Sequence, residues 1–280
     1  MIKTSCVIAL LAPEISLKSK QVQNRMHEIM KNNIALALKN SDIEYSSVRH
    51  KAGRIFFNTT NPKKAIEILK TCFGINLLIE SYNLIFNKEK SEDKSLDFVI
   101  NYGLSVCDKN ISGEFAVRAK SFNKYIDARK IELGLGSKIL ENIKETKVKL
   151  SNPHCQCNVI VFENEVFVYF KSVDGAKGMP LGIQGKVAIN ITNLEQGSEL
   201  IIKLMKFGCL PVLIKNDLTS KVDLKKYNSY IDLEIVSLDE AKLSFVKNNT
   251  KAFFCDTTNL GEKKKFDKLI ETKSFAPFLE

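Results

Sequence analysis

The chain has 280 residues and a mass of 31.6 kDa, with 44% hydrophobic residues, 26% charged residues and a net charge of +10. Thirteen glycines and six prolines exclude a collagen-like or low-complexity chain, and the apolar content excludes a largely disordered one. This length suits two or three modest domains of about 100 to 150 residues each.

We expect no membrane segment, because no window approaches the ~18 consecutive apolar residues of a membrane span. The early apolar run Cys6–Ala12 is interpreted as a buried strand rather than a signal peptide, since Pro13 and Glu14 leave a poor cleavage site after it. Seven scattered cysteines, an odd number, favour reduced thiols and a cytoplasmic protein.

The positive charge is concentrated in the first two thirds of the chain. Residues 1–186 hold 28 Lys/Arg against 19 Asp/Glu, a net +9, whereas residues 187–280 hold 14 against 13, a net +1. Solvated lysine faces are the commoner cause of such a bias, but a module that binds a polyanion has the same signature.

The first 75 residues predict a ferredoxin-like module, with strand, helix, strand, strand and helix in that order and a further strand behind them. Asn61 and Pro62 predict the start of its second helix, as a cap followed by proline at the first helical position. The expected elements are strand 2–11, helix 18–39, strands 44–50 and 54–58, helix 62–71 and strand 76–86.

A second α/β module is expected over residues 76–172, a Gly-rich linker over 173–186, and a small parallel-sheet, Rossmann-like domain over 187–280. The fold class is therefore α/β, with α+β modules at the N-terminus. The expected elements are helix 91–107, strand 113–119, helix 127–142, strands 147–150, 155–162 and 166–170, then strands 187–191, 209–214, 231–236 and 252–255 alternating with helices 195–207, 238–247 and 261–271.

Seven short segments of the chain carry a family resemblance by their order. They are Pro13–Lys20, Lys31–Ile34, Ala52–Phe56, Cys72–Ile75, Glu114–Tyr125, Lys147–Pro153 and Asp174–Lys186. With these segments in this order, residues 10–215 resemble the tRNA 4-thiouridine synthetase family. The resemblance implies a ferredoxin-like domain, then a THUMP domain, which is an RNA-binding module, and then an ATP-pyrophosphatase (PP-loop) domain.

Cations and aromatic residues alternate within Arg118–Tyr125, so phosphates can be paired with cations while unstacked bases lie on rings. The resemblance implies that this segment and the basic residues of the first module hold the acceptor end of tRNA. Ordinary core packing with solvated cations is the competing interpretation. The candidate RNA-binding residues are Lys18, Lys20, Arg25, Arg54, Arg118, Lys120, Phe122, Lys124 and Tyr125.

The predicted nucleotide loop departs from the family pattern SGGxDS. The family's two glycines are replaced by Asn193 and Leu194, and its aspartate by Gln196, while Glu195 adds negative charge. A side chain where backbone must approach phosphate opposes ATP binding, so we predict a degenerate loop. This loop comprises Thr192, Asn193, Leu194, Glu195, Gln196 and Gly197.

Other candidate sites are interpreted as structural. His154, Cys155 and Cys157 lack the second ligand cluster of a zinc site, so core packing is favoured and no metal is expected. Cys209 and Cys255, the thiols of the last region, end or follow apolar stretches and are predicted to be buried. No catalytic residue is assigned.

The leading hypothesis is a tRNA-binding protein that acts in tRNA modification by thiolation, holds the acceptor end and lacks its own adenylation activity. It requires no cofactor and implies a separate tRNA-modifying enzyme as partner. The alternative is an active tRNA sulfurtransferase that uses ATP and a persulfide sulfur donor, and a scaffold that has abandoned RNA is ranked last. A homodimer stays open, because related proteins pair as dimers.

Overall fold

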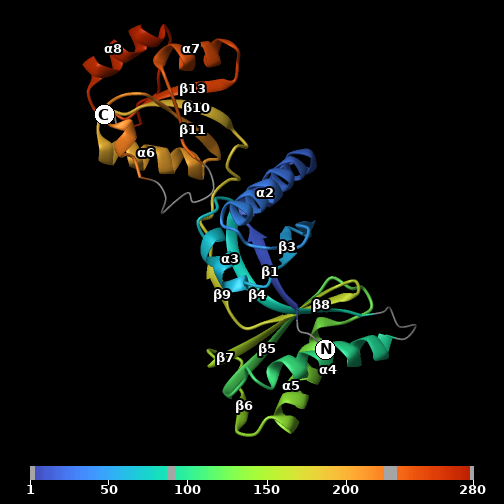
Figure 1. Cartoon of the computed structure of the whole chain (residues 1–280). Helices are drawn as coiled ribbons and strands as arrows, with labels where there is room; N and C mark the ends of the chain where they lie inside the picture. The colour runs from blue at the N-terminus through green and yellow to red at the C-terminus, as the bar shows by residue number, and fades with distance from the viewer. Residues whose placement is uncertain (1–3, 87–91, 224–231, 278–280) are drawn as a thin grey trace.

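The computed structural model describes residues 4–86, 92–223 and 232–277. Three regions follow one another along an elongated molecule, with the third region at one end and the second at the other (Figure 1). The predicted positions 2, 3, 91 and 231 lie outside the described residues.

The first region has the predicted order of strands and two long helices, with an additional short helix, α1, that the sequence did not predict. Its elements are β1 (Thr4–Leu11), α1 (Pro13–Ser16), α2 (Lys20–Asn40), β2 (Arg49–Lys51), β3 (Arg54–Asn58), α3 (Pro62–Leu69) and β4 (Ile75–Ile85). The predicted cap of α3 is confirmed, because the Asn61 side chain accepts a hydrogen bond from the Lys64 N–H and Pro62 begins the helix. Met26, Met30 and Ile34 of α2 are buried in the core of this region.

The second region continues the same sheet. Its elements are α4 (Glu92–Cys107), β5 (Gly113–Ser121), α5 (Ala128–Asn142), β6 (Thr146–Val148), β7 (Cys155–Phe162), β8 (Glu165–Tyr169) and β9 (Ser172–Asp174). The strand order is β2-β3-β1-β4-β8-β7-β5-β6, with β9 also paired to β4. The long strand β4 pairs with β1 through one part of its length and with β8 through its last four residues. One sheet therefore fixes the second region against the first.

The glycine-rich segment after β9 is held against the first region by backbone hydrogen bonds. Lys177 donates to the carbonyl of Ile75 at 2.8 Å and accepts from Gly74 at 2.9 Å. A Cβ on Gly175 would lie 2.4 Å from the Ile75 oxygen, so this close approach needs glycine. The buried Asn33 amide of α2 donates to the Leu181 carbonyl at 3.1 Å. This segment is therefore fixed in place.

The third region is the predicted small parallel sheet, in the order β12-β11-β10-β13. Its elements are β10 (Gly185–Asn190), α6 (Leu194–Lys206), β11 (Cys209–Ile214), η1 (Thr219–Lys221), β12 (Glu234–Val236), α7 (Leu238–Val246), β13 (Thr250–Cys255) and α8 (Leu260–Ile270).

One predicted strand is wrong over most of its length. Residues 44–48 make a single bridge, Tyr45 to Thr59, instead of the expected continuous strand, and regular pairing begins at Arg49. Side-chain bonds replace the ladder here, because Thr59 donates through its hydroxyl to the Glu44 carbonyl and the Ser46 hydroxyl accepts from the Asn58 N–H.

Candidate nucleic-acid interface and nucleotide loop

Phe122 is a partly exposed ring fixed by a second aromatic residue. It directly follows β5, its N–H donates to the Val161 carbonyl, and 41% of the residue is exposed. The ring stacks on that of buried Phe162, with centroids 4.5 Å apart and planes only 6° from parallel. One face of Phe122 is thus occupied by Phe162, and the exposed remainder is a rigid apolar surface on which a base can stack.

Three cations surround these two rings. The Arg54 guanidinium carbon lies 5.2 Å from the centroid of Phe122 and 5.7 Å from that of Phe162. Lys120 Nζ lies 5.5 Å from the Phe122 centroid, and Lys51 Nζ lies 5.7 Å from that of Phe162. We call Lys51, Arg54, Lys120, Phe122 and Phe162 the aromatic–cation cluster. Its members come from both the first and the second region, so the shared sheet assembles it.

Arg54 has incomplete internal hydrogen bonding. Its Nη1 donates to the Ala52 carbonyl at 2.7 Å, while its Nε is buried and has no hydrogen-bond partner among the described residues. Burial lowers the pKa of Arg54, although a guanidinium keeps its proton in proteins. A charged, partly desolvated donor beside an aromatic surface suits an anionic ligand that carries bases.

Lys124 and Tyr125 form a neighbouring exposed pair, with Lys124 Nζ 4.6 Å from the Tyr125 ring centroid. The contact with the Tyr125 side chain raises the pKa of Lys124. Asn123 fixes the turn between the pair and Phe122, because its Oδ1 accepts from the Tyr125 N–H at 2.8 Å. A hollow of 270 Å³ is lined by Phe122, Asn123, Lys124, Tyr125 and Glu163.

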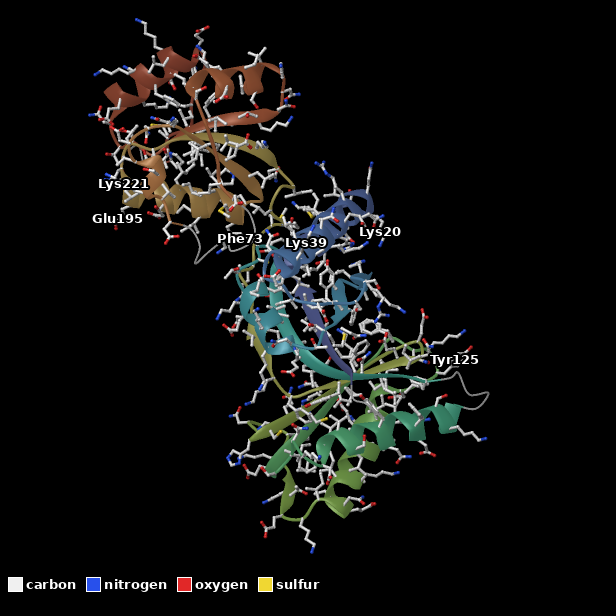
Figure 2. The ribbon with its side chains drawn as sticks, in the orientation of Figure 1. Lys20, Lys39, Phe73, Tyr125, Glu195 and Lys221 are labelled. Carbon is white, nitrogen blue, oxygen red and sulfur yellow. The ribbon has the colours of Figure 1, made fainter. Side chains whose placement is uncertain are left out.

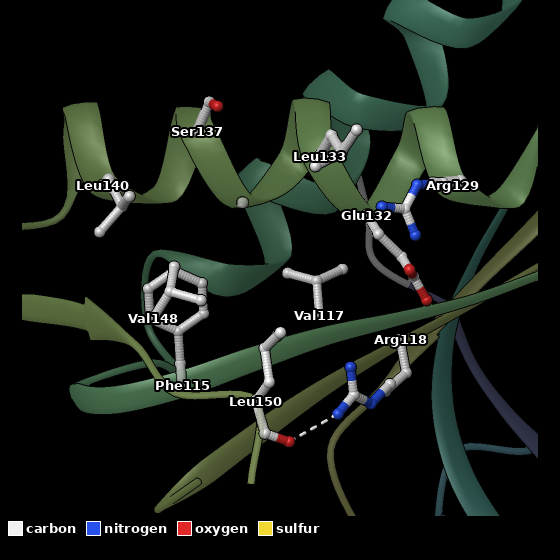
Figure 3. Close-up of a pocket in the computed structure, with 11 residues that line it drawn as sticks. Phe115, Val117, Arg118, Arg129, Glu132, Leu133, Ser137, Leu140, Val148 and Leu150 are labelled. Carbon is white, nitrogen blue, oxygen red and sulfur yellow. Dashed lines mark hydrogen bonds between the residues drawn. The ribbon is translucent and has the colours of Figure 1, made fainter.

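Arg118 lies in a different place from the cluster. Its Nη2 donates to the Leu150 carbonyl at 2.7 Å, and the residue lines a groove of 350 Å³ between α5 and strands β5 and β6 (Figure 3). Arg129 and Glu132 lie at the same end of the groove as Arg118 in this view. Glu132 Oε1 accepts a hydrogen bond from the Ala119 N–H at 2.9 Å. The groove's exposed apolar side chains are Leu133, Leu140, Val148 and Leu150.

Lys18, Lys20 and Arg25 lie at and before the start of α2, and all three are exposed. Lys20 lines a separate cavity beside that helix. Lys20 and Tyr125 lie toward the same edge of the molecule in Figure 2, and Glu195 lies toward the opposite edge. The predicted RNA-binding residues therefore divide among the aromatic–cation cluster, the neighbouring Lys124–Tyr125 pair, the groove and the first turns of α2.

Lys51 and Phe162 of the cluster and Arg129 of the groove were not predicted from the sequence. Phe162 ends a strand that the sequence predicts as core, and burial of its ring gives no sign that Phe122 stacks on it. Lys51 carried a weak signal, because it precedes the Ala52–Gly53 turn directly opposite Arg54 in the hairpin.

The predicted nucleotide loop is occupied by an internal carboxylate. Asp256 follows β13, is fully buried, and accepts at Oδ1 from both the N–H and the hydroxyl of Thr192, each at 2.7 Å. Its Oδ2 accepts from the Asn193 N–H at 3.0 Å. The Asn193 side chain caps α6 by accepting from the Glu195 and Gln196 N–H groups, both at 3.0 Å. Oxygens of the chain itself thus satisfy four backbone donors of this loop.

Gly197 makes room for this arrangement. A Cβ there would lie 2.6 Å from Ile191 Cγ2 and 2.8 Å from Asp256 Oδ2. An ATP phosphate needs unpaired N–H donors at a strand-to-helix turn. In this loop the Thr192 and Asn193 N–H groups already donate to the Asp256 carboxylate. These internal bonds favour the predicted degenerate loop.

The thiols are buried rather than activated. Burial raises the pKa of Cys209 and of Cys255, so neither is a ready thiolate. Cys155 and Cys157 pack with Val159 and Val161 on one face of β7, as predicted. Among the described residues, no group of three or more His, Cys, Asp or Glu side chains could hold a metal ion.

Two family models match the chain. The ThiI ferredoxin-like domain matches residues 8–78 and the THUMP domain matches residues 105–171. No helix in the described part of the chain is both long and apolar enough to cross a bilayer.

Similar proteins include probable tRNA sulfurtransferases. A probable tRNA sulfurtransferase from Methanosarcina mazei is 30% identical over 67% of this chain and 46% of its own length. One from Thermococcus kodakarensis is 28% identical over 70% of this chain and 51% of its own length. The chain thus spans about half the length of the curated relatives it matches.

Two crystal structures show the same fold across nearly the whole chain. A Pyrococcus horikoshii protein matches with a TM-score of 0.77 at 20% identity. The match covers 99% of this chain and 94% of the Pyrococcus chain. A 4-thiouridine synthetase in a complex with RNA and bound ATP has a TM-score of 0.72 at 20% identity, with 99% and 81% of the two chains covered. The expected fold class and family resemblance are confirmed: this chain joins a ThiI ferredoxin-like domain to a THUMP domain and is similar to the tRNA sulfurtransferases.

Proposed function

We propose that this chain binds tRNA at its acceptor end and acts in tRNA thiolation without adenylating the tRNA itself. The observation that carries the proposal is the aromatic–cation cluster, in which Arg54 of the first domain lies over Phe122 of the second. Relatives named as probable tRNA sulfurtransferases support a role in tRNA modification, and the charge of +9 on residues 1–186 supports binding to a polyanion.

The geometry supports an unpaired strand as the ligand. A ring with one face already stacked can receive a base on its exposed part, while Arg54, Lys51 and Lys120 offer charges to the phosphates on either side of that base. The groove beside Arg118 offers an apolar floor with guanidinium groups at its rim, which suits a further unstacked base. The end of tRNA is single-stranded and meets both requirements.

The proposed lack of adenylation rests on Asp256. Its two oxygens take the N–H groups of Thr192 and Asn193, and a buried carboxylate repels a triphosphate at the same position. A separate tRNA-modifying enzyme would then activate the tRNA that this chain presents. The alternative is an active sulfurtransferase with an atypical nucleotide site, which the names of the relatives favour.

Two measurements test the proposal. Filter binding of tRNA to the full chain across a salt series should show affinity falling steeply with salt, and a flat response contradicts RNA binding through phosphates. Removal of the single-stranded 3′ end should weaken binding if the acceptor end is the ligand.

Release of pyrophosphate from ATP in the presence of tRNA should be absent. Its presence, together with its loss on substitution of Thr192 or Gly197, would establish the active sulfurtransferase instead.

A further inference from the structure

A cavity of 390 Å³ lies beside α2, where two histidines face each other. The rings of His27 and His50 stack with centroids 3.6 Å apart and planes 25° from parallel. The volume is an order of magnitude above the about 30 Å³ of one water molecule, so it can hold a small anion with some of its water. The cavity is lined by Leu11, Ala12, Pro13, Ile15, Ser16, Lys20, Gln23, His27, His50, Ala52 and Gly53.

One ring nitrogen of the pair lacks an internal partner. His50 Nε2 is buried and has no hydrogen-bond partner among the described residues. The ring that stacks on His50 belongs to His27, which is only 7% exposed. Buried polar atoms in proteins are nearly always paired, so this unpaired nitrogen at a cavity that Lys20 also lines points to a ligand that pairs with it.

The surroundings of the pair select an anion. Lys20, His27 and Lys31 follow one another at intervals of seven and four residues, which places them on one face of α2. The N-terminus of this 21-residue helix lies at Lys20, and Ser19 provides no side-chain cap there, so the positive end of the helix dipole faces the same region.

The charges that act on the pair are mostly positive. Burial, followed by Lys20, lowers the pKa of His27, and burial, His27, Lys20 and Lys31 lower the pKa of His50 to about 4. Glu28 opposes these effects on both rings, but its carboxylate is paired with Lys31 at 3.1 Å. A bound anion would relieve this repulsion and favour the protonated, double-donor form of each imidazole.

The cavity adjoins the aromatic–cation cluster through the β2–β3 turn. The hairpin pairs His50 with Ile55, whose side chain is buried on the α2 side, and pairs Lys51 with Arg54, which belongs to the cluster. Ala52 lines the cavity, and its carbonyl accepts from Arg54. One short turn therefore separates the two sites.

We propose that His27, His50 and Lys20 form a binding pocket for a phosphate group of the RNA that the cluster holds. The choice of RNA as the source of the phosphate rests on the proposed function. The same chemistry serves a backbone phosphodiester or a terminal phosphate.

Nuclear magnetic resonance of the histidine ring nitrogens in the full chain tests the pocket without RNA. The chain has three histidines, and exposed His154 in the second domain is an internal control. Inorganic phosphate should raise the pKa of both His27 and His50 relative to sodium chloride at equal ionic strength, and should leave His154 unchanged. Unchanged values for His27 and His50 overturn the pocket.

RNA binding tests the source of the phosphate. His50→Gln should weaken binding of an acceptor-stem RNA roughly tenfold, as expected for loss of a bond to a charged group, whereas His154→Gln should bind as the wild type does. The wild-type affinity should also rise more than that of His50→Gln as the pH falls below about 6.5, where imidazoles gain protons. His27→Gln provides a second variant, and circular dichroism checks that each variant is folded.

RNA with and without a 5′-phosphate distinguishes a terminal phosphate from a backbone phosphodiester as the group in the pocket. A 5′-phosphate that strengthens binding to the wild type but not to His50→Gln identifies a terminal phosphate, and an equal effect on both proteins identifies the backbone. If His50→Gln binds RNA as the wild type does at every pH, the pocket does not serve RNA and the inference fails, while the proposed function stands. If the wild type binds no RNA but phosphate still shifts both histidines, the proposed function fails and the phosphate pocket stands.

Discussion

Arg54 and Phe122 belong to different domains, yet the guanidinium carbon lies 5.2 Å from the ring centroid. The contact depends on β4, which pairs with β1 of the first domain and β8 of the second, and so joins both domains in one sheet. The RNA-binding surface proposed for this protein is therefore as rigid as the sheet that carries it, and its parts need no ligand to assemble.

The first prediction concerns the ring. Phe122→Leu keeps an apolar contact with Phe162 but removes the aromatic face, so RNA binding should weaken by about 1–3 kcal/mol, the value of one base stacked on an aromatic side chain. Filter binding at fixed salt measures it. Leu243→Ala on α7, at an exposed leucine outside the cluster and the groove, tests whether loss of any exposed apolar group has the same effect, and equal losses would contradict a specific role for Phe122.

The second prediction concerns the phosphates. Lys51→Gln and Lys120→Gln should each reduce the slope of log affinity against log salt by about 0.7, the value for one contact with single-stranded nucleic acid. Lys221→Gln in the third domain removes the same charge from an exposed site away from the cluster and should leave the slope unchanged. Three equal slopes would show that net charge alone determines binding.

The sequence predicted most helices and strands because periodicity is local, and it predicted the Asn61 cap because the cap and the first turn of its helix lie within a few residues of each other. It also identified Phe122, Arg54 and Lys120 as candidates from residue type. It could not show that Arg118 turns toward Leu150 rather than toward Phe122, because that depends on the approach of a loop far along the chain. Asp256 was missed for the same reason, since only the pairing of β10 with β13 brings it to Thr192.

The third prediction concerns Asp256 and stability. Asp256→Ala leaves the Thr192 and Asn193 donors without their acceptor, so the free energy of unfolding should fall by about 1.5–3 kcal/mol, the range for hydrogen bonds to a charged group. Urea denaturation measures the loss. Asp217→Ala, at an exposed position of the same domain, should change stability by less than about 0.5 kcal/mol. A loss as small for Asp256 would contradict a structural role for its carboxylate.

The fourth prediction concerns pH. The folded chain lowers the pKa of His50 from 6.5 to about 4, so between these values the unfolded chain binds more protons than the folded one. Stability is therefore fully present above about pH 6.5 and should fall as the pH drops toward 4. Thermal denaturation of wild type and His50→Gln in acetate buffers should show a smaller fall for the variant. Phosphate should reduce the fall in the wild type if the pocket binds it.

The fifth prediction uses Gly136, which lines the groove on α5 and has nothing within 4 Å of an added Cβ. Gly136→Ala should raise stability by up to about 1 kcal/mol, because alanine replaces glycine inside a helix without a clash. Gly136→Met projects further into the groove and leaves every charge in place, so it should weaken binding of RNA with an intact 3′ end more than binding of RNA that lacks it. Equal weakening of both RNAs would place the 3′ end elsewhere, and unchanged binding would show that the groove takes no base. The alanine variant is the matched control, because it tests the helix without filling the groove.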